Sequence, residues 1–178
     1  MRGMPSFGSR LPSHVPDRLG VAPGEKVVAW GCGPGADVTE ATYVLATDRA
    51  LYVEAVEVDG KAQRVPWSSI SKATWDEPVL DVVVLDAAGR PGSLLHLRVD
   101  QARDLPAAVR DRVTASVVIS DRVALGEGAK ALLVARRGSD DGEIRWSVVF
   151  DAGLDPRDPT LRAAADEALA QLRDSLGI

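Results

Sequence analysis

The stretch Glu40-Ala-Thr-Tyr-Val-Leu-Ala-Thr-Asp-Arg-Ala-Leu-Tyr-Val-Glu-Ala-Val-Glu-Val58 predicts two β-strands folded back on each other. Thr42–Ala46 and Ala50–Val58 are rich in β-branched and aromatic residues, which favour extended backbone. Between them, Thr47–Arg49 supplies polar side chains that can hydrogen-bond their own backbone in a turn. The fold is built outward from this antiparallel hairpin.

Two further strands flank the hairpin. Glu25–Trp30 is a short apolar run, followed by the glycine- and proline-rich Gly31–Gly35, which predicts an irregular connection. On the other side, Asp59–Gly60 is a strong turn signal and Lys61–Pro66 can return as a strand. The sequence therefore predicts four antiparallel strands in meander order.

Three more strands and a helix follow. The strands are predicted at Ser71–Asp76, Val79–Asp86 and Ser93–Val99. In the last one, Leu95, Leu97 and Val99 alternate with His96, Arg98 and Asp100, the pattern of a sheet with one buried face. Asp104 can then cap a helix whose Leu105, Val109 and Val113 recur every four residues.

The C-terminal third predicts a strand, a hairpin and a helix. A strand is expected from Thr114 toward Leu125, and a hairpin from Ala129–Arg137 and Glu143–Asp151. In the second arm of that hairpin, one face is predicted to be buried and consists of Ile144, Trp146, Val148 and Phe150.

The final helix has clear boundaries. Asp158 is its predicted N-cap, Pro159 stands at the first helical position, and Gly177 ends the helix. Its apolar stripe is formed by Leu161, Ala165, Leu169, Leu172 and Leu176.

Composition narrows the classes of function. The chain has 178 residues, of which 46% are hydrophobic and 26% charged, so it can bury a proper core without disulfides. Its net charge of −5, with basic residues spread along the chain, argues against nucleic acid and anionic membranes as partners. A low aromatic share of 4% also limits stacking on bases.

The N-terminal residues and the single cysteine favour a cytoplasmic protein. Residues 1–23 are predicted to form an irregular arm because prolines interrupt them, although apolar residues such as Val15 and Leu19 could lie across the core. The same prolines argue against a signal peptide, and no apolar run is long enough to insert into a membrane. Cys32, the only cysteine, allows no internal disulfide.

Two segments resemble bacterial pleckstrin-homology-like (PH-like) domains. In those domains a turn with the sequence Thr-Asp-Arg is followed by an apolar strand, and Tyr43–Val53 is similar to this segment. Arg64–Ile70 is similar to the fourth-strand segment that follows it. The resemblance covers residues 24–115. It implies an α+β fold, a PH-like antiparallel split β-barrel closed by a helix. The resemblance does not extend to residues 116–178, which are expected to form a strand, a β-hairpin and a helix as an extension packed on the barrel.

The resemblance also implies a function that is not enzymatic. Such domains serve as binding or assembly modules, so a protein partner or self-association is expected, with outward Arg98 and His96 and the apolar part of the arm as candidate contacts. Members that bind phosphoinositides use basic residues after the first strand. Here residues 31–37 contain no lysine or arginine and end in Asp37, so lipid binding is not expected.

An alternative comes from Val27–Gly35, which is similar to the cofactor loop of S-adenosylmethionine-dependent methyltransferases. In that reading the loop Gly31-Cys32-Gly33-Pro34-Gly35 approaches the cofactor and Glu57 or Asp59 holds the ribose. Ala29 stands where those enzymes usually place an acid, and the following segment predicts strands rather than a helix. The binding-module hypothesis is therefore preferred, and no cofactor is expected.

The remaining reactive residues have simpler interpretations. Cys32 has no histidine near it in sequence to activate it, and His96 points outward beside Arg98 on its strand. The acidic run from Asp140 to Glu143 matches a solvated hairpin tip better than a calcium loop. The sequence thus predicts no catalytic, cofactor-binding or metal-binding residue, and a protein that is not an enzyme.

Overall fold

The structure is a computed structural model that describes residues 10–35, 41–54 and 62–177. Its helical elements are α1 (Val15–Arg18), the 3-10 helix η1 (Trp67–Ser69), α2 (Leu105–Ser116) and α3 (Pro159–Leu176). Its strands are β1 (Val27–Pro34), β2 (Ala41–Thr47), β3 (Ala50–Glu54), β4 (Ala62–Pro66), β5 (Ile70–Asp76), β6 (Val79–Leu85), β7 (Pro91–Arg98), β8 (Val117–Gly126), β9 (Ala129–Arg137) and β10 (Ile144–Phe150).

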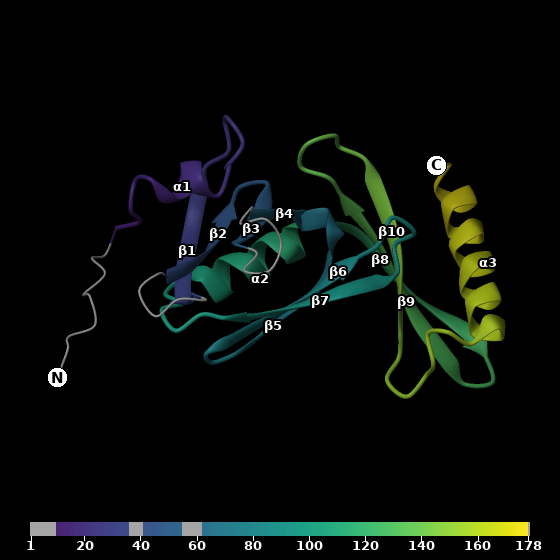
Figure 1. The fold of residues 1–178 in the computed structure, drawn as a ribbon. Coiled ribbons are helices and arrows are strands. Elements are labelled where there is room, and N and C mark those ends of the chain that lie inside the picture. The colour runs from purple at the N-terminus through teal and green to yellow at the C-terminus, as the bar shows by residue number, and fades with distance from the viewer. Residues whose placement is uncertain (1–9, 36–40, 55–61, 178) are drawn as a thin grey trace.

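These strands form three antiparallel sheets, with the orders β1-β2-β3-β4, β5-β6-β7 and β10-β9-β8. The predicted α+β class is confirmed. In the part of the chain that the structure describes, the sheets remain separate and do not close into one hydrogen-bonded barrel. Figure 1 shows the first two sheets at the N-terminal end of the molecule and α3 at the opposite end.

The central hairpin is confirmed, with β2 pairing with β3 so that Val44 lies opposite Val53. In its turn, the Thr47 hydroxyl oxygen accepts hydrogen bonds from the backbone N–H groups of Arg49 at 3.1 Å and Ala50 at 2.9 Å. The predicted continuation of the second strand over residues 55–58, the turn at 59–60 and residue 61 lie outside the described residues.

The main core lies between the first two sheets and α2. Leu80 and Val82 of β6, together with Val99, pack with Leu105 and Val109 of the helix. The predicted strands and the alternation along β7 are confirmed. Asp104 stands at the N-cap as predicted, but its side chain makes no capping hydrogen bond.

A second apolar cluster covers the other face of the first sheet. Val15 and Leu19, in and after the short helix α1, are buried against Tyr43, Leu45 and Tyr52. Apolar residues of the arm thus pack on the first sheet, a possibility that the sequence left open. The arm is also not wholly irregular, because residues 15–18 form a helical turn.

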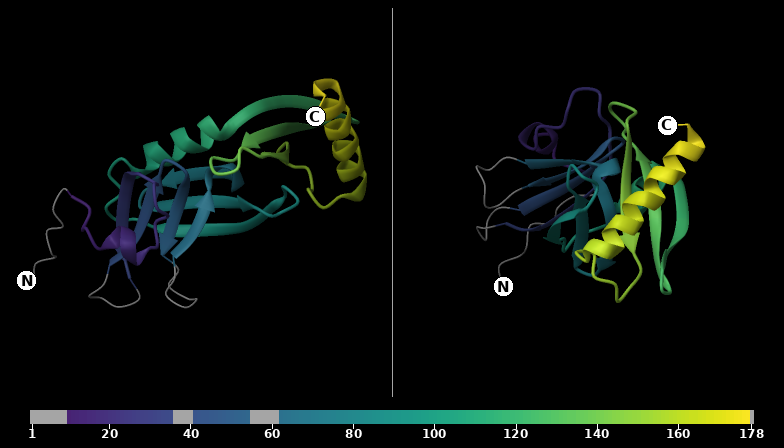
Figure 2. Two further views of the ribbon diagram at one scale, coloured as in Figure 1. Left: turned by 90° about the horizontal axis from the view of Figure 1, so that it is seen from above. Right: turned by 90° about the vertical axis from the view of Figure 1, so that its right-hand side faces the viewer.

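The helix α2 passes directly into β8, as Figure 2 shows. The prediction of a strand from Thr114 was wrong for residues 114–116, which extend the helix. There the apolar repeat of Leu105 and Val109, both buried in the core, outweighs the β-branched residues, and Ser116 donates its hydroxyl to the Val113 carbonyl at 2.7 Å.

The helix α3 begins and ends as predicted. The Asp158 carboxylate accepts hydrogen bonds from the N–H groups of Thr160 at 2.8 Å and Leu161 at 3.4 Å, and Gly177 ends the helix in the left-handed conformation. Both termini therefore follow the sequence pattern.

One face of β10 was predicted to be buried, and the structure buries it less than predicted. Trp146 and Phe150 lie on one face, as their register with Ala135 and Ala131 requires, but both are only half-buried. The reason is the position of α3, which packs over β8 and β9 and crosses the sheet diagonally (Figure 2). The β9 residues Ala131 and Ala135 are consequently fully buried.

Candidate functional site

The glycine run is part of a strand, so its prediction as an irregular connection was wrong. β1 continues to Pro34 and pairs with β2. Gly31 and Gly33 face the chain that follows β7, and a Cβ atom at Gly33 would collide with the carbonyl oxygen of Arg98. Between them, Cys32 exchanges two backbone hydrogen bonds with Gln101, at 3.2 and 3.0 Å. The glycines permit this close crossing of the first two sheets.

This arrangement bears on the methyltransferase alternative. In a cofactor loop of that type, the glycines leave a strand and enter a helix. Here the glycines from Gly31 to Gly33 lie within a strand, and the next described element, β2, is also a strand. Glu57 and Asp59, the proposed ribose acids, lie outside the described residues, as do residues 36 and 37 of the proposed lipid loop.

Cys32 is a core residue. Only 3% of it is exposed, and it packs in the cluster with Tyr43 and Leu45. Burial raises the pKa of its thiol, an effect that the positive charge of Arg103 partly offsets. A buried thiol with a raised pKa is a poor nucleophile.

His96 and Arg98 project outward from β7, as predicted. His96 Nδ1 lies 2.6 Å from Asp81 Oδ1, and Arg98 Nε donates to Asp100 Oδ1 at 2.8 Å. The His96 side chain is 68% exposed. Both residues are therefore accessible surface groups, and exposed contacts of this kind contribute little to stability.

The acidic tip of the β9–β10 hairpin is exposed, as predicted, but one of its carboxylates also contacts arginines of the N-terminal sheet. Asp140 accepts from Arg64 Nη2 at 2.8 Å and lies 3.9 Å from Arg49. Asp141 accepts from Arg145 at 2.8 Å, and Arg145 also donates to the Ser68 hydroxyl at 2.8 Å. Folding brings Arg49 and Arg64 to the tip from sequence positions far away, whereas Arg145 lies four residues after Asp141 in the same hairpin.

Arg64 is the centre of this network. It donates to Glu25 Oε1 through Nε at 2.9 Å and Nη2 at 2.6 Å, and to the Tyr52 hydroxyl at 3.1 Å. The Glu25 side chain is only 2% exposed. Burial by itself would lower the pKa of Arg64, but the hydrogen bonds to Glu25, Asp140 and Tyr52 raise it above its ordinary value. Arg64 is thus a fixed cation held from several sides.

A second arginine, Arg136, joins β9 to β5. It is 4% exposed and donates to the Ser147 hydroxyl at 3.0 Å and to the Ser71 carbonyl at 3.1 Å. No partner for its Nε is found among the described residues. Burial lowers the pKa of Arg136, because the buried guanidinium loses its contact with water.

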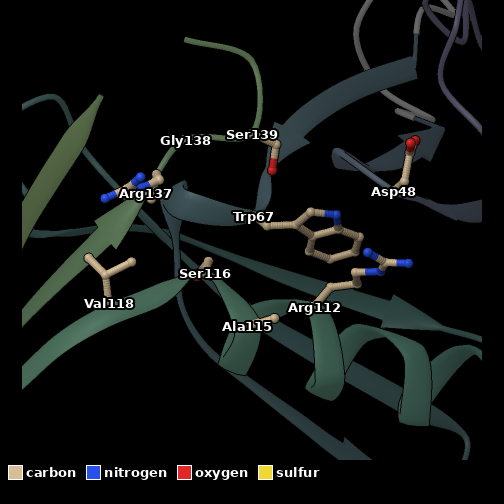
Figure 3. Close-up of a pocket in the computed structure, with 9 residues that line it drawn as sticks. All are labelled: Asp48, Trp67, Arg112, Ala115, Ser116, Val118, Arg137, Gly138 and Ser139. Atoms are coloured by element: carbon tan, nitrogen blue, oxygen red, sulfur yellow. The ribbon is translucent and has the colours of Figure 1, made fainter. Parts of the chain in front are cut away.

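A cavity of about 280 Å³ lies where the N-terminal sheets, the α2–β8 junction and the hairpin tip meet (Figure 3). Its lining comprises Asp48, Trp67, Arg112, Ala115, Ser116, Val118, Arg137, Gly138 and Ser139. The guanidinium groups of Arg112 and Arg137 have no hydrogen-bond or ion-pair partner in the part of the chain that the structure describes. Figure 3 shows Arg112 beside the Trp67 ring, reaching toward Asp48, and Arg137 pointing the opposite way.

Sequence reasoning missed these arginines. Nothing in the residues around Arg64 and Arg112 sets them apart from ordinary surface arginines, which usually remain solvated. The one available indication was alternation, since Arg136 occupies a strand position whose neighbours two residues away are apolar or buried.

Within the described ranges, no group of three or more His, Cys, Asp or Glu residues is placed to hold a metal ion, and no helix is long and apolar enough to cross a membrane. Comparisons with protein-family models, curated proteins and solved structures gave no match. Function is therefore inferred from the sequence and the geometry alone.

Proposed function

We propose that the chain is a non-enzymatic, cytoplasmic binding module of the bacterial PH-like type that works through protein contacts. The observation that carries this proposal is the order of elements: four antiparallel strands, three antiparallel strands, and then α2. This is the order that the resemblance of Tyr43–Val53 and Arg64–Ile70 implies.

The packing supports the proposal. Leu105 and Val109 of α2 enter the core that the first two sheets share, as a closing helix must. At one corner, the crossing of Gly31 and Gly33 over residues 98–101 brings the two sheets together. Both features connect the sheets into one scaffold, and neither places a reactive group in a cavity.

An exposed strand edge offers a docking place. β8 pairs with β9 on one side and with no described strand on the other. An unpaired edge presents free N–H and C=O groups that an extended segment of a partner can use. Val118 on this strand is 43% exposed and would add apolar contact.

The candidate partner contacts named from the sequence are not all exposed on the surface. Arg98 and His96 remain on the surface. The apolar residues of the arm are occupied within the chain, because Val15 and Leu19 are buried against the first sheet. The partner surface is therefore expected on the strands rather than on the arm.

Affinity capture with the full chain tests the proposal. The immobilised protein is incubated with a lysate of the source cells, with and without excess untagged protein as competitor, and light scattering measures its mass in solution. A partner that the untagged protein displaces, or a defined oligomer, is expected. A strict monomer that retrieves no displaceable protein would refute the proposal.

A calorimetric titration with S-adenosylmethionine separates the proposal from the enzyme alternative. No heat of binding is expected, because Gly31–Pro34 forms part of a paired strand. Saturable heat that is lost in Gly33→Ala, with the variant still folded by circular dichroism, would favour the methyltransferase alternative.

A further inference from the structure

We propose that the arginines at the joint between the N-terminal sheets and the hairpin tip bind an acidic segment of a protein partner. The arginine surface consists of Arg49, Arg64, Arg112 and Arg137, around the cavity lined by Trp67. This inference rests on the proposed function as a protein-binding module and names its surface and the chemistry of its partner.

Asp140 shows how a carboxylate docks on this surface. It contacts Arg64 at 2.8 Å and Arg49 at 3.9 Å, although it comes from a hairpin tip far away in the sequence. Arg64 is already oriented by Glu25 and Tyr52, so a carboxylate meets a guanidinium whose side-chain entropy has been lost beforehand. The chain thus contains its own example of the contact that an acidic partner would make.

Arg112 and Arg137 are left for a partner. Neither guanidinium has a hydrogen-bond or ion-pair partner among the residues that the structure describes, whereas Arg64 and Arg145 are both paired with carboxylates. The cavity between them has room for side chains, with the Trp67 ring as one wall and the Ser139 hydroxyl at its rim.

The directions of the two arginines select an extended ligand. In Figure 3, the Arg112 guanidinium reaches past Trp67 toward Asp48, and the Arg137 guanidinium points away from it. One small anion therefore cannot contact both groups at once. An extended peptide with several carboxylates can contact both, and its aliphatic stems can lie along Trp67.

The local charge favours such a peptide. The lining of the cavity contains two arginines, Arg112 and Arg137, and one carboxylate, Asp48, so the lining carries a net positive charge. The neighbouring arginines, Arg49, Arg64 and Arg145, are paired with carboxylates of the chain. The chain as a whole carries −5. A basic patch on an acidic protein steers acidic partners to one place.

The test uses the full chain and a fluorescein-labelled, amidated hexaglutamate peptide, with binding followed by fluorescence anisotropy at about 150 mM salt, where charges are screened beyond about 8 Å. Arg112→Gln and Arg137→Gln are each expected to weaken binding about fivefold, as for the loss of one exposed ion pair of about 1 kcal/mol. The matched control is Arg110→Gln, because Arg110 lies on the same helix with a 78% exposed side chain. Thermal unfolding of each variant verifies that it is folded.

Asp140→Asn provides an independent readout. Removing the carboxylate frees Arg64 and Arg49, so hexaglutamate is expected to bind this variant more tightly than wild type, about two- to fivefold. Tighter binding supports competition between Asp140 and the partner at one surface, and weaker binding contradicts it.

Three results would overturn the inference: no anisotropy change with hexaglutamate, equal weakening in Arg110→Gln, or full displacement of the peptide by inorganic phosphate at matched ionic strength, which marks a simple anion site. The proposed function fails separately. If the captured partner binds Arg112→Gln and Arg137→Gln as well as wild type, this surface is wrong and the binding module stands. If hexaglutamate binds but no partner is captured, the surface holds and the module's cellular function is unsupported.

Discussion

Replacing Gly33 by alanine tests the crossing of the two sheets most directly. The added Cβ would collide with the backbone carbonyl oxygen of Arg98, and a second backbone atom of that residue lies 2.9 Å from it. Because backbone atoms rather than flexible side chains oppose the methyl group, β1 and the segment after β7 must move apart. The neighbouring pair of hydrogen bonds between Cys32 and Gln101 is then lost or stretched.

The expected cost follows from these contacts. Overpacking a well-filled site costs about 1–3 kcal/mol, and two backbone hydrogen bonds contribute about 0.5–1.5 kcal/mol each. Alanine also restricts the unfolded chain more than glycine does, which offsets about 0.4–1 kcal/mol of this loss of stability. We therefore expect Gly33→Ala to lower the free energy of unfolding by about 2–4 kcal/mol, a large share of the stability of a domain of this size.

Urea unfolding followed by circular dichroism measures the effect. With a slope of about 2 kcal/mol per molar, the midpoint should fall by about 1–2 M. Gly31→Ala, whose Cβ meets mainly the side chains of Val99 and Leu105, should fall less, and Gly92→Ala, with no contact below 3.3 Å, should stay within about 1 kcal/mol of wild type. An unchanged midpoint for Gly33→Ala would refute the crossing, and if that variant does not fold, the order of the other two still tests it.

Three further predictions concern the C-terminal third. Asp158→Ala should destabilise the protein by about 1 kcal/mol, because α3 loses its N-cap, and calorimetry should show a Tm about 2–4 °C lower. Arg136→Met should unfold in urea within about 1 kcal/mol of wild type while Arg136→Ala loses about 2–4 kcal/mol, because methionine fills the site and the buried guanidinium has no carboxylate partner among the described residues; equal losses would contradict this. Hydrogen bonding from the Glu143 N–H and from Arg145 lowers the pKa of Asp141, so its contribution is present above the unfolded pKa of about 3.9 and is lost as pH falls through the lower folded value. The urea midpoints of wild type and Asp141→Asn should therefore converge at acid pH, and a constant difference down to the lowest pH would contradict the shift.

Local patterns predicted most of the secondary structure. Alternation along β7 placed Leu95 and Leu97 inward, and the capping residues of α3 fixed both of its ends. These patterns depend on near neighbours in the chain, so a single sequence carries them. When only the local sequence is considered, the glycines of Gly31–Gly35 suggest a turn. In the structure, Gly31 and Gly33 instead permit close packing against a distant segment of the chain.

The candidate surface could not be predicted in this way. Arg49, Arg64 and Asp140 are distant in sequence and meet only because the β9–β10 hairpin folds back on the first sheet. The sequence of an acidic hairpin tip does not show whether the tip is solvated or contacts another part of the chain. Nor does the sequence show whether an arginine forms an ion pair.

The sequence by itself determined most of the strands and the two long helices, since periodicity, caps and residue types are local properties. Only the tertiary structure decided that the glycine run is a crossing, that Cys32 is buried, and that Arg112 and Arg137 line a cavity without partners among the described residues. The physical reason is that burial, charge pairing and close approach depend on which distant segments meet, and that is settled by the packing of the whole chain.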